Sequence, residues 1–408
     1  MAMLLRLALR NLSRHRRRTV LTGLTIVVGY VLMSFMLSLD AGTYGAIIEM
    51  FTGDHTGHVQ VHARGYLDRP GLHKTVQDGE TFGNLLESDP RVQRAAPRIY
   101  SSVLAFAGPK TTGLRLIGID PDRERSTTRL AAKVSAGSFL PAEGNVILLG
   151  SDTAEVLGVG PGNEVVLVGQ AADGSVANDL FTVAGLLGSS ADQSERSNGY
   201  LPLRTAQEFL ALGGRVHEWA LRLTHYGLAE EVAQALEGVL DRTGFSGLEV
   251  DPWQVVEKEF TKTMEGDRKG NTVMQFIFVL IVALGVLNTV LMSLLERTRE
   301  FGVLRSLGTS PGLLFTLLVL ETGLLTLGAL GVALVLAGCL NLYFQHYGIR
   351  YPEPMSVAGM LMDRMEGALE LHVFLLPALT IFLTALLVSL YPAMRAATIR
   401  PVDALRTF

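Results

Sequence analysis

Apolar residues in this chain gather in four long runs, at residues 20–39, 273–295, 313–340 and 373–391. A helix needs about 20 mainly apolar residues to cross the hydrocarbon layer of a bilayer, which is roughly 30 Å thick. Each run meets this requirement, so the pattern predicts four transmembrane helices. Arginines precede the first run, but it is too long for a signal peptide and no cleavage site clearly follows it, so a membrane anchor is predicted.

Between the first and second runs the pattern changes to short β-branched stretches separated by glycine and proline, from about residue 58 to about residue 250. Such stretches are typical of strands joined by turns. Amphipathic helices are predicted between them at residues 151–159, 205–212 and 228–242. The fold class is therefore an integral α-helical membrane protein with four transmembrane helices and a large α+β domain inserted between helices 1 and 2.

The charge distribution predicts the orientation. With four spans, both termini and the loop between the second and third spans lie on one side. Three carboxylates on that side, Glu296, Glu300 and Asp403, are outnumbered by twelve arginines: Arg6, Arg10, Arg14, Arg16, Arg17, Arg18, Arg297, Arg299, Arg305, Arg395, Arg400 and Arg406. The whole chain has a formal net charge of -4, so the other side is acidic. Positive loops face the cytoplasm, which places both termini there and the inserted domain outside.

These patterns divide the chain into nine segments. They are a basic amphipathic cytoplasmic helix (1–19), transmembrane helix 1 (20–45), a periplasmic α+β domain with a stalk (46–268), transmembrane helix 2 (269–295), a cytoplasmic loop with a short helix (296–312), transmembrane helix 3 (313–342), a short periplasmic loop (343–371), transmembrane helix 4 (372–392) and a cytoplasmic C-terminal tail (393–408). Pro352 and Pro354 argue against a long helix in the short periplasmic loop.

Composition supports a membrane protein with a sizeable soluble part, because 48% of the residues are hydrophobic and 18% are charged. The single cysteine, Cys339, falls in the third run. The outer domain is therefore predicted to be held by its core without disulfides, which its length of over 200 residues allows.

No phosphate loop of the form G-x-x-x-x-G-K-[ST] occurs, nor H-E-x-x-H, G-x-S-x-G or a paired-cysteine signature. No catalytic residue and no metal site are predicted, and the chain is not expected to be an enzyme. His55, His58 and His62 form the one histidine cluster. Polar strand residues are the favoured interpretation, and whether they bind a metal stays open.

Glu321 is the only acidic residue inside a predicted span. Intramembrane carboxylates suggest a functional site, but a hydrogen bond to Asn288 or Thr289 of the second span is the favoured interpretation. Small residues that allow close helix contact recur in the second and third spans, at Gly285, Gly323, Gly328, Gly331 and Gly338.

The loop between the second and third spans contains ERTREFGVLRSLGT, residues 296–309, which mixes charge, glycine and apolar residues at helical spacing. Phe301, Val303, Leu304 and Leu307 are predicted to form one apolar face, with charged residues on the other sides. Such a helix suits contact with a soluble partner at the inner membrane surface; the alternative is a loop at the lipid headgroups.

Four stretches resemble the FtsX-like permeases, the membrane subunits of type VII ABC transporters, and in particular the lipoprotein-releasing and MacB-like branches. ALRNLSRHRRRTVLTGLTIVVG is similar to the N-terminal segment of the family, and SDTAEVLGVGPGNEVVLVGQ with FTVAGLL to its MacB-like periplasmic core domain. ERTREFGVLRSLGTSPGLL is similar to the loop that meets the ATPase, and YPAMRAATIRPVDALR to the C-terminal signature. The motifs occur in the family order.

The resemblance implies a half-transporter that pairs with a second permease copy or a homologous permease and with a cytoplasmic ABC ATPase dimer. The partner ATPase would bind ATP and Mg²⁺, no cofactor would bind this chain, and no nucleic acid is involved. A periplasmic acceptor or adaptor protein is a further candidate partner. The residues expected to couple to the ATPase are Arg297, Glu300, Phe301, Leu304, Arg305 and Gly308.

The expected function is ATP-driven extraction of a substrate at the periplasmic face of a bacterial inner membrane. GHVQVHARGYLDRP further resembles lipoprotein-releasing permeases, which favours lipoprotein release. The alternatives are MacB-like efflux with an adaptor and an outer-membrane duct, and FtsX-like signalling to a cell-wall hydrolase. A hydrophobic opening for the substrate, or plain contact with lipid or helices, is expected at Met33, Met36, Leu37, Phe276 and Val279. The substrate, the acceptor and the choice between homodimer and heterodimer stay open.

Overall fold

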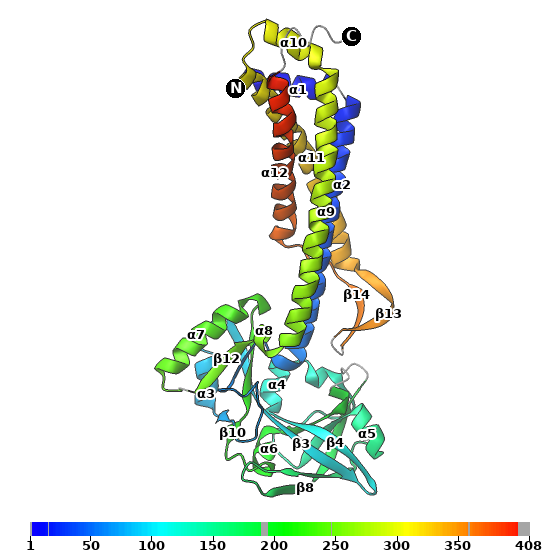
Figure 1. Cartoon of the computed structure of the whole chain (residues 1–408). Coiled ribbons are helices and arrows are strands. Elements are labelled where there is room, and N and C mark those ends of the chain that lie inside the picture. The colour runs from blue at the N-terminus through cyan, green and yellow to red at the C-terminus, as the bar shows by residue number, and fades with distance from the viewer. Residues whose placement is uncertain (1, 15, 189–194, 246, 358–359, 399–408) are drawn as a thin grey trace. The chain divides into compact units, whose positions relative to one another are not determined.

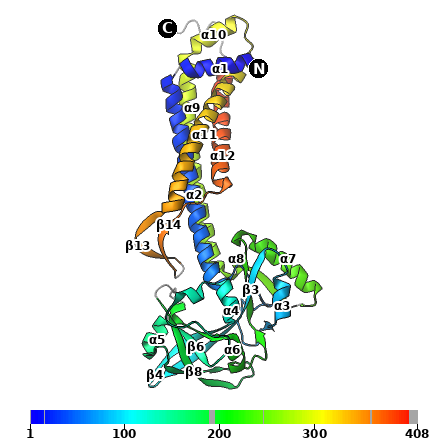
Figure 2. The same cartoon turned by 180° about the vertical axis from the view of Figure 1, so that it is seen from behind.

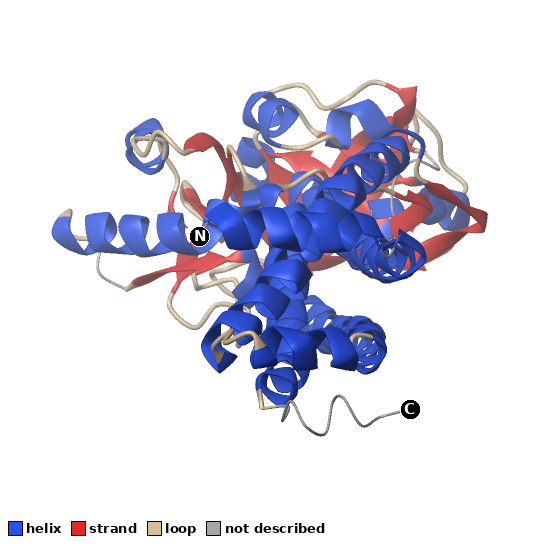
Figure 3. Ribbon diagram, turned by 90° about the horizontal axis from the view of Figure 1, so that it is seen from above, coloured by secondary structure: helices blue, strands red, loops and turns tan. Residues whose placement is uncertain are grey.

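The computed structural model describes residues 2–14, 16–188, 195–245, 247–357 and 360–398. It separates into two compact units (Figures 1 and 2). The first comprises Met1–Tyr44, Met264–Pro352 and Arg364–Phe408, and the second comprises Gly45–Thr263 and Glu353–Asp363. Figure 3 distinguishes the helices from the strands by colour.

Long helices build the first unit. Its helices are α1 (Ala2–Arg14), α2 (Arg16–Phe51), α9 (Lys258–Glu296), α10 (Thr298–Ser306), α11 (Pro311–Tyr347) and α12 (Leu371–Ala397). Among the described residues, four helical segments are long and apolar enough to cross a membrane: Thr19–Phe51, Lys258–Glu296, Pro311–Tyr347 and Leu371–Ala397. The four predicted apolar spans are therefore helices. The stalk predicted before the second span is continuous with that span only from Lys258, where α9 begins. Residues 251–257, which precede it, form the end of a strand and the short α8.

The four long helices share one apolar core. Its buried residues are Ile26 and Tyr30 on α2, Val282 and Val286 on α9, Ala329, Leu330, Ala333 and Ala337 on α11, and Ile381 and Ala385 on α12. Two hydrogen bonds add to it: the Tyr30 hydroxyl donates to the carbonyl of Phe374 at 3.1 Å, and Asn341 Nδ2 donates to Ser34 Oγ at 3.1 Å. Polar groups in hydrocarbon need such partners, so these bonds favour one arrangement of the helices.

Glycine allows α2 and α9 to approach each other closely. A Cβ atom at Gly285 would lie 2.7 Å from Thr25 Cγ2, and one at Gly29 would overlap Val282 Cγ2. The predicted close contact at Gly285 is confirmed. The same prediction is wrong for Gly328, Gly331 and Gly338 within this chain, because a Cβ atom there would meet nothing described within 4 Å.

The second unit is the predicted α+β domain. Its strands are β1 (Val59–Ala63), β2 (Val76–Gln77), β3 (Val92–Ala107), β4 (Lys110–Ile119), β5 (Val134–Gly137), β6 (Val146–Gly150), β7 (Glu164–Gln170), β8 (Val176–Leu187), β9 (Asn198–Pro202), β10 (Arg215–Val216), β11 (Glu218–Leu223) and β12 (Leu248–Pro252). Its helices are α3 (Glu80–Leu86), α4 (Pro121–Thr127), α5 (Ser151–Leu157), α6 (Leu203–Phe209), α7 (Ala229–Arg242) and α8 (Trp253–Val256), with short turns at Thr52–Thr56, Leu130–Lys133, Glu195–Ser197 and Tyr226–Leu228.

Most of these strands join one sheet. Among the described residues ten strands pair in the order β12-β1-β11-β3-β4-β9-β6-β8-β5, with β7 bridging β3 and β8. β1, the first strand of this sheet along the chain, is antiparallel to β12, the last, in the register Val61 opposite Val250. The chain therefore enters and leaves this sheet through neighbouring strands.

Local patterns explain the helices of this unit. α7 buries Ala229, Val232, Ala233, Leu236 and Leu240 and exposes its glutamates, as its periodicity predicts. The short periplasmic loop predicted at 343–371 instead contains two paired strands, β13 (Ile349–Val357) and β14 (Met360–Met365). The prediction from Pro352 and Pro354 that no long helix forms here is confirmed, because proline is tolerated in an edge strand.

Candidate functional site

Helix α10, in the loop between the second and third long helices, is anchored by Phe301. This side chain is fully buried and belongs to a core cluster with Leu294, Leu314, Leu318, Ala393 and Ala396. Full burial of a phenylalanine contributes about 1.5–3 kcal/mol. Gly308, at φ 94°, reverses the chain after the helix, and Ser310 Oγ then accepts from the backbone N–H of Leu313 to begin α11.

A buried charge network fixes the start of the same helix. Arg297 is 5% exposed, and its Nη1 donates to both carboxylate oxygens of Glu321, at 3.3 and 3.1 Å. Its Nε donates to Glu300 at 3.1 Å, and its guanidinium carbon lies 5.0 Å from the centre of the Phe301 ring. Asn11 of α1 also donates to Glu321, at 3.3 Å. One arginine thus ties α10 to α11, and one glutamate ties both to α1.

This network corrects the expected partner of Glu321. The predicted hydrogen bond from the second span does not occur at Asn288, which is exposed, and Thr289 Oγ1 donates to Gly285 of its own helix at 2.8 Å. A charged arginine beside the carboxylate satisfies it better than an amide, because an ion needs compensation in a medium of low polarity. The partner of the Glu321 carboxylate is therefore Arg297, the residue that precedes α10.

A different face of α10 is open. Val303, Leu304 and Leu307 are 43%, 36% and 78% exposed, and Arg299 and Glu300 flank them. We call these five residues the outer face of α10. Exposed apolar side chains bordered by charge are typical of protein interaction sites.

The outer face includes two of the six predicted coupling residues, Glu300 and Leu304. Arg297 and Phe301 are buried inside the unit, so their side chains anchor the helix and are not available to a partner. Arg305 is half-buried and donates to the carbonyl of Thr309 at 3.1 Å, which stabilises the turn that contains Gly308. The predicted apolar face of Phe301, Val303, Leu304 and Leu307 is therefore correct for its last three members and wrong for Phe301, which faces the core.

The residues predicted to line a hydrophobic opening differ in their exposure. Phe276 is 67% exposed, whereas Met33 is 4% exposed and packs inward. Met36, Leu37 and Val279 are half-buried. Around Phe276, α9 exposes a continuous apolar surface: Val273, Met274, Ile277, Leu280, Ile281 and Leu284.

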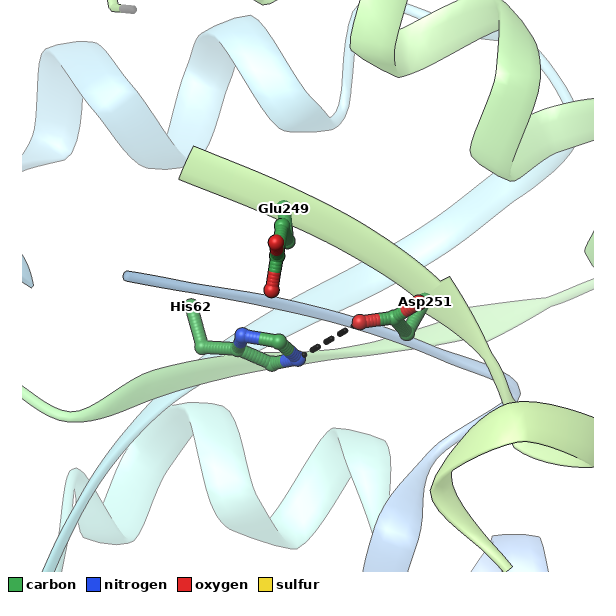
Figure 4. Close-up of side chains that lie close together, drawn as sticks. All are labelled: His62, Glu249 and Asp251. Atoms are coloured by element: carbon green, nitrogen blue, oxygen red, sulfur yellow. Dashed lines mark ion pairs between the residues drawn. The ribbon is translucent and has the colours of Figure 1, made fainter. Parts of the chain in front are cut away.

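Of the clustered histidines, His58 and His62 have different partners. His58 accepts a hydrogen bond from the backbone N–H of Leu223 at 3.0 Å, and burial, with Arg222 and His225 nearby, lowers its pKa to about 4. His62 lies 3.0 Å from Asp251, and Figure 4 shows both beside Glu249. Burial alone lowers the pKa of His62, but Asp251 and the carbonyl of Ala63 outweigh it, so the pKa lies above its ordinary value. The side chain of His55 lies outside the described residues.

The second unit also contains a cavity of about 790 Å³ that sequence reasoning missed. Arg98, Glu124 and Glu218, which are buried, and Tyr100, which is half-buried, line it. Arg98 binds Glu124 at 2.8 Å, and the hydroxyl of Tyr100 donates to Glu218 at 2.7 Å. Burial raises the pKa of Tyr100, and Glu218 raises it further. The volume is that of a small-molecule site, but Arg98 already pairs with Glu124 and also lies 3.8 Å from Glu218.

Two family models match the sequence. The model described as MacB-like periplasmic core domain matches residues 19–239, and the model described as FtsX-like permease C-terminal matches residues 272–401. The first covers α2 and most of the second unit, and the second covers most of α9 and the helices that follow it.

Two groups of curated proteins are similar along the chain. The lipoprotein-releasing system transmembrane protein LolC of Xylella fastidiosa (strain Temecula1 / ATCC 700964) is 28% identical over 93% of this chain and 95% of its own length. The macrolide export ATP-binding/permease protein MacB of Shewanella sp. (strain ANA-3) is 23% identical over 98% of this chain but 60% of its own length. The solved periplasmic region of MacB from Actinobacillus actinomycetemcomitans is 18% identical to this chain. The match covers 53% of this chain and 98% of that structure, with a TM-score of 0.38.

Proposed function

Because this chain belongs to the family with a MacB-like periplasmic core domain and an FtsX-like permease C-terminal domain, the permeases of type VII ABC transporters, we propose that it releases lipoproteins from a bacterial inner membrane. ABC permease subunits are not themselves enzymes. A separate cytoplasmic ATPase dimer binds ATP and Mg²⁺ in this proposal. The permease pairs with a second copy or a homologue, both termini face the cytoplasm, and a periplasmic acceptor takes the lipoprotein.

The observation that supports the choice of substrate is the similarity to LolC. The LolC relative is 28% identical over 93% of this chain, whereas the MacB relative is 23% identical over 98% of it. The higher identity favours lipoprotein release over macrolide-type efflux.

The outer face of α10 is the proposed contact with the ATPase. Its three apolar side chains, Val303, Leu304 and Leu307, would enter a groove of the partner, and Arg299 and Glu300 would pair at the rim. A push on this face acts on α11 directly, because Phe301 and the Arg297–Glu321 pair lock α10 to that helix.

Helix α9 is the proposed path of movement toward the second unit. It runs without interruption through 39 residues, which corresponds to a rod about 58 Å long. Its exposed apolar surface around Phe276 is the proposed place where an acyl chain or the second permease meets this subunit. Of the residues predicted for a hydrophobic opening, Met33 is the one whose burial argues against such a role.

Variants on the outer face of α10 test the coupling step. Leu304→Ala with Leu307→Ala removes two exposed apolar side chains, and we expect loss of co-purification with the ATPase and of coupled ATP hydrolysis. The matched control is Leu5→Ala with Leu9→Ala on α1, whose side chains are 44% and 51% exposed. The control should leave both measurements unchanged. Equal effects of the two pairs would contradict the assignment and favour a loop that only touches lipid headgroups.

Depletion of the protein in its host tests the substrate. Lipoproteins should then accumulate in the inner membrane, and the complex purified in nanodiscs should contain an ATPase and lipidated cargo. Co-purification with an adaptor and an outer-membrane duct, with lipoprotein sorting intact, would instead support efflux. Loss of cell-wall hydrolysis with sorting intact would support signalling.

A further inference from the structure

Three side chains from the first and last strands of the second unit lie together on one face of the sheet (Figure 4). His62 on β1 stands opposite Glu249 on β12, and Asp251 follows two residues later on the same face of β12. One potential ligand atom from each lies within 4.8 Å of the other two. An imidazole with two carboxylates is a donor set for Zn²⁺ and related divalent transition metals.

The His62 ring has the surroundings of a metal ligand. It is fully buried, and its Nδ1 lies 3.2 Å from the carbonyl oxygen of Ala63. When Nδ1–H donates to that carbonyl, the lone pair of Nε2 points away from it. Metal-binding histidines typically donate the other ring N–H to a carbonyl or carboxylate in this way.

The contact between His62 and Asp251 is short but is not aligned as a hydrogen bond. Nε2 lies 3.0 Å from Oδ2 of Asp251, yet Nε2 is buried without a hydrogen-bond partner of acceptable geometry among the described residues. Two ligand atoms on one tetrahedral Zn²⁺ are about 3.3 Å apart, since each bond is about 2.0–2.1 Å long. The separation therefore suits two atoms that share an ion.

Glu249 completes the set. Its Oε2 accepts a hydrogen bond from the backbone N–H of Gly65 at 2.8 Å, which fixes the carboxylate beside the histidine. Its side chain is 33% exposed and that of Asp251 is 22% exposed, so an ion has access from solvent and water can supply a fourth ligand. Arg64 approaches Glu249 only to 3.7 Å and is 70% exposed, so it does not occupy the site.

We propose that His62, Glu249 and Asp251 bind one divalent transition-metal ion, preferentially Zn²⁺. The ion joins β1 to β12, the edge strand of the sheet. These strands are also the first and last of the sheet along the chain: η1 (Thr52–Thr56) and α2 precede β1, while α8 and α9 follow β12. The metal therefore holds together the two strands that connect to the long helices, a role that goes beyond the proposed transport function.

The test uses the full chain in nanodiscs, purified with a tag that lacks histidine and stripped with a chelator. Isothermal titration with ZnCl₂ should give one saturable site per chain, and Zn²⁺ should raise the thermal midpoint of unfolding. Co²⁺ bound in its place should give the visible absorption of a four- or five-coordinate ion.

Asp251→Asn and Glu249→Gln should each weaken Zn²⁺ binding at least about a hundredfold, because loss even of a group that only orients a ligand costs about 10–100-fold. The matched control, Glu237→Gln, changes an exposed carboxylate on α7 of the same unit and should bind Zn²⁺ like the unchanged protein. Metal-free circular dichroism of the variants shows that they fold.

The absence of saturable binding to the unchanged protein would overturn the proposal and leave an ordinary ion pair between His62 and Asp251. Unchanged affinity in both ligand variants would overturn it as well, by placing the ion elsewhere. Neither result bears on ATPase coupling or lipoprotein sorting, so the failure of this proposal and that of the proposed function are distinguishable.

Discussion

Arg297 makes two contacts of equal length whose energies should differ several-fold. Its nitrogen atoms lie 3.1 Å from a carboxylate oxygen of Glu321 and 3.1 Å from one of Glu300, but the Glu321 side chain is 7% exposed and the Glu300 side chain 45%. Two unit charges at this distance attract by about 5 kcal/mol at an effective dielectric constant of about 20 and by about 1.3 kcal/mol in bulk water. Burial, and not distance, therefore decides which pair matters.

We expect Glu321→Gln to lower the free energy of unfolding of the first unit by about 3–5 kcal/mol, because it leaves the buried Arg297 charge without its main partner. Glu300→Gln removes a solvent-screened pair and should cost about 0.2–1 kcal/mol. Both changes replace a carboxylate by an amide of the same shape, so each is the control for the other.

The assay is denaturant unfolding of the chain in mixed micelles, followed by far-ultraviolet circular dichroism, which reports mainly on the long helices. The double variant Arg297→Gln with Glu321→Gln completes a cycle and should recover part of the loss, since it leaves no uncompensated charge. Equal losses for Glu300→Gln and Glu321→Gln, within about 0.5 kcal/mol, would refute the reasoning that burial sets the energy.

Two further predictions concern helix contact and pH. Gly29→Ala should destabilise the first unit by about 1–3 kcal/mol in the same assay, because its Cβ overlaps Val282, whereas Gly331→Ala, in open space, should be neutral or stabilise by up to about 1 kcal/mol. His58 stays neutral in the folded chain down to pH about 4, while the unfolded chain binds a proton near pH 6.5. Stability of the second unit should therefore fall by about 3 kcal/mol as pH drops from 6.5 to 4, and His58→Gln should remove that part of the dependence on pH in thermal unfolding.

Local patterns explain why most elements could be predicted from the sequence. Whether an apolar run of 20 residues forms a helix, or an alternating stretch of five forms a strand, depends mainly on residues that are close in the sequence. The four apolar helices and α7 are therefore found where periodicity places them.

The site depended on information that periodicity lacks. Phe301 and Leu304 are three positions apart and so lie on neighbouring sides of helix α10. The sequence does not say which of the two faces the core formed with α11 and α12. Glu321 pairs with an arginine 24 positions earlier, across a turn whose geometry is fixed by Gly308. His62 meets Asp251 only because β1 pairs with β12 in one register, and a shift by one residue would place them on opposite faces.

Backbone hydrogen bonds span the junctions between α9 and its two neighbouring helices. One residue, Glu257, separates α8 from α9, and its N–H bonds to the carbonyl of Trp253 while its own carbonyl accepts from Thr261. Arg297 separates α9 from α10 in the same manner, with bonds to Ser293 and Phe301 on its two sides. Each junction residue thus donates one backbone hydrogen bond to the helix before it and accepts one from the helix after it. At Arg297 the side chain adds its pairs with Glu300 and Glu321, so a force on the outer face of α10 acts on α9 and α11 through bonded groups and would be relieved by movement of helices against their neighbours.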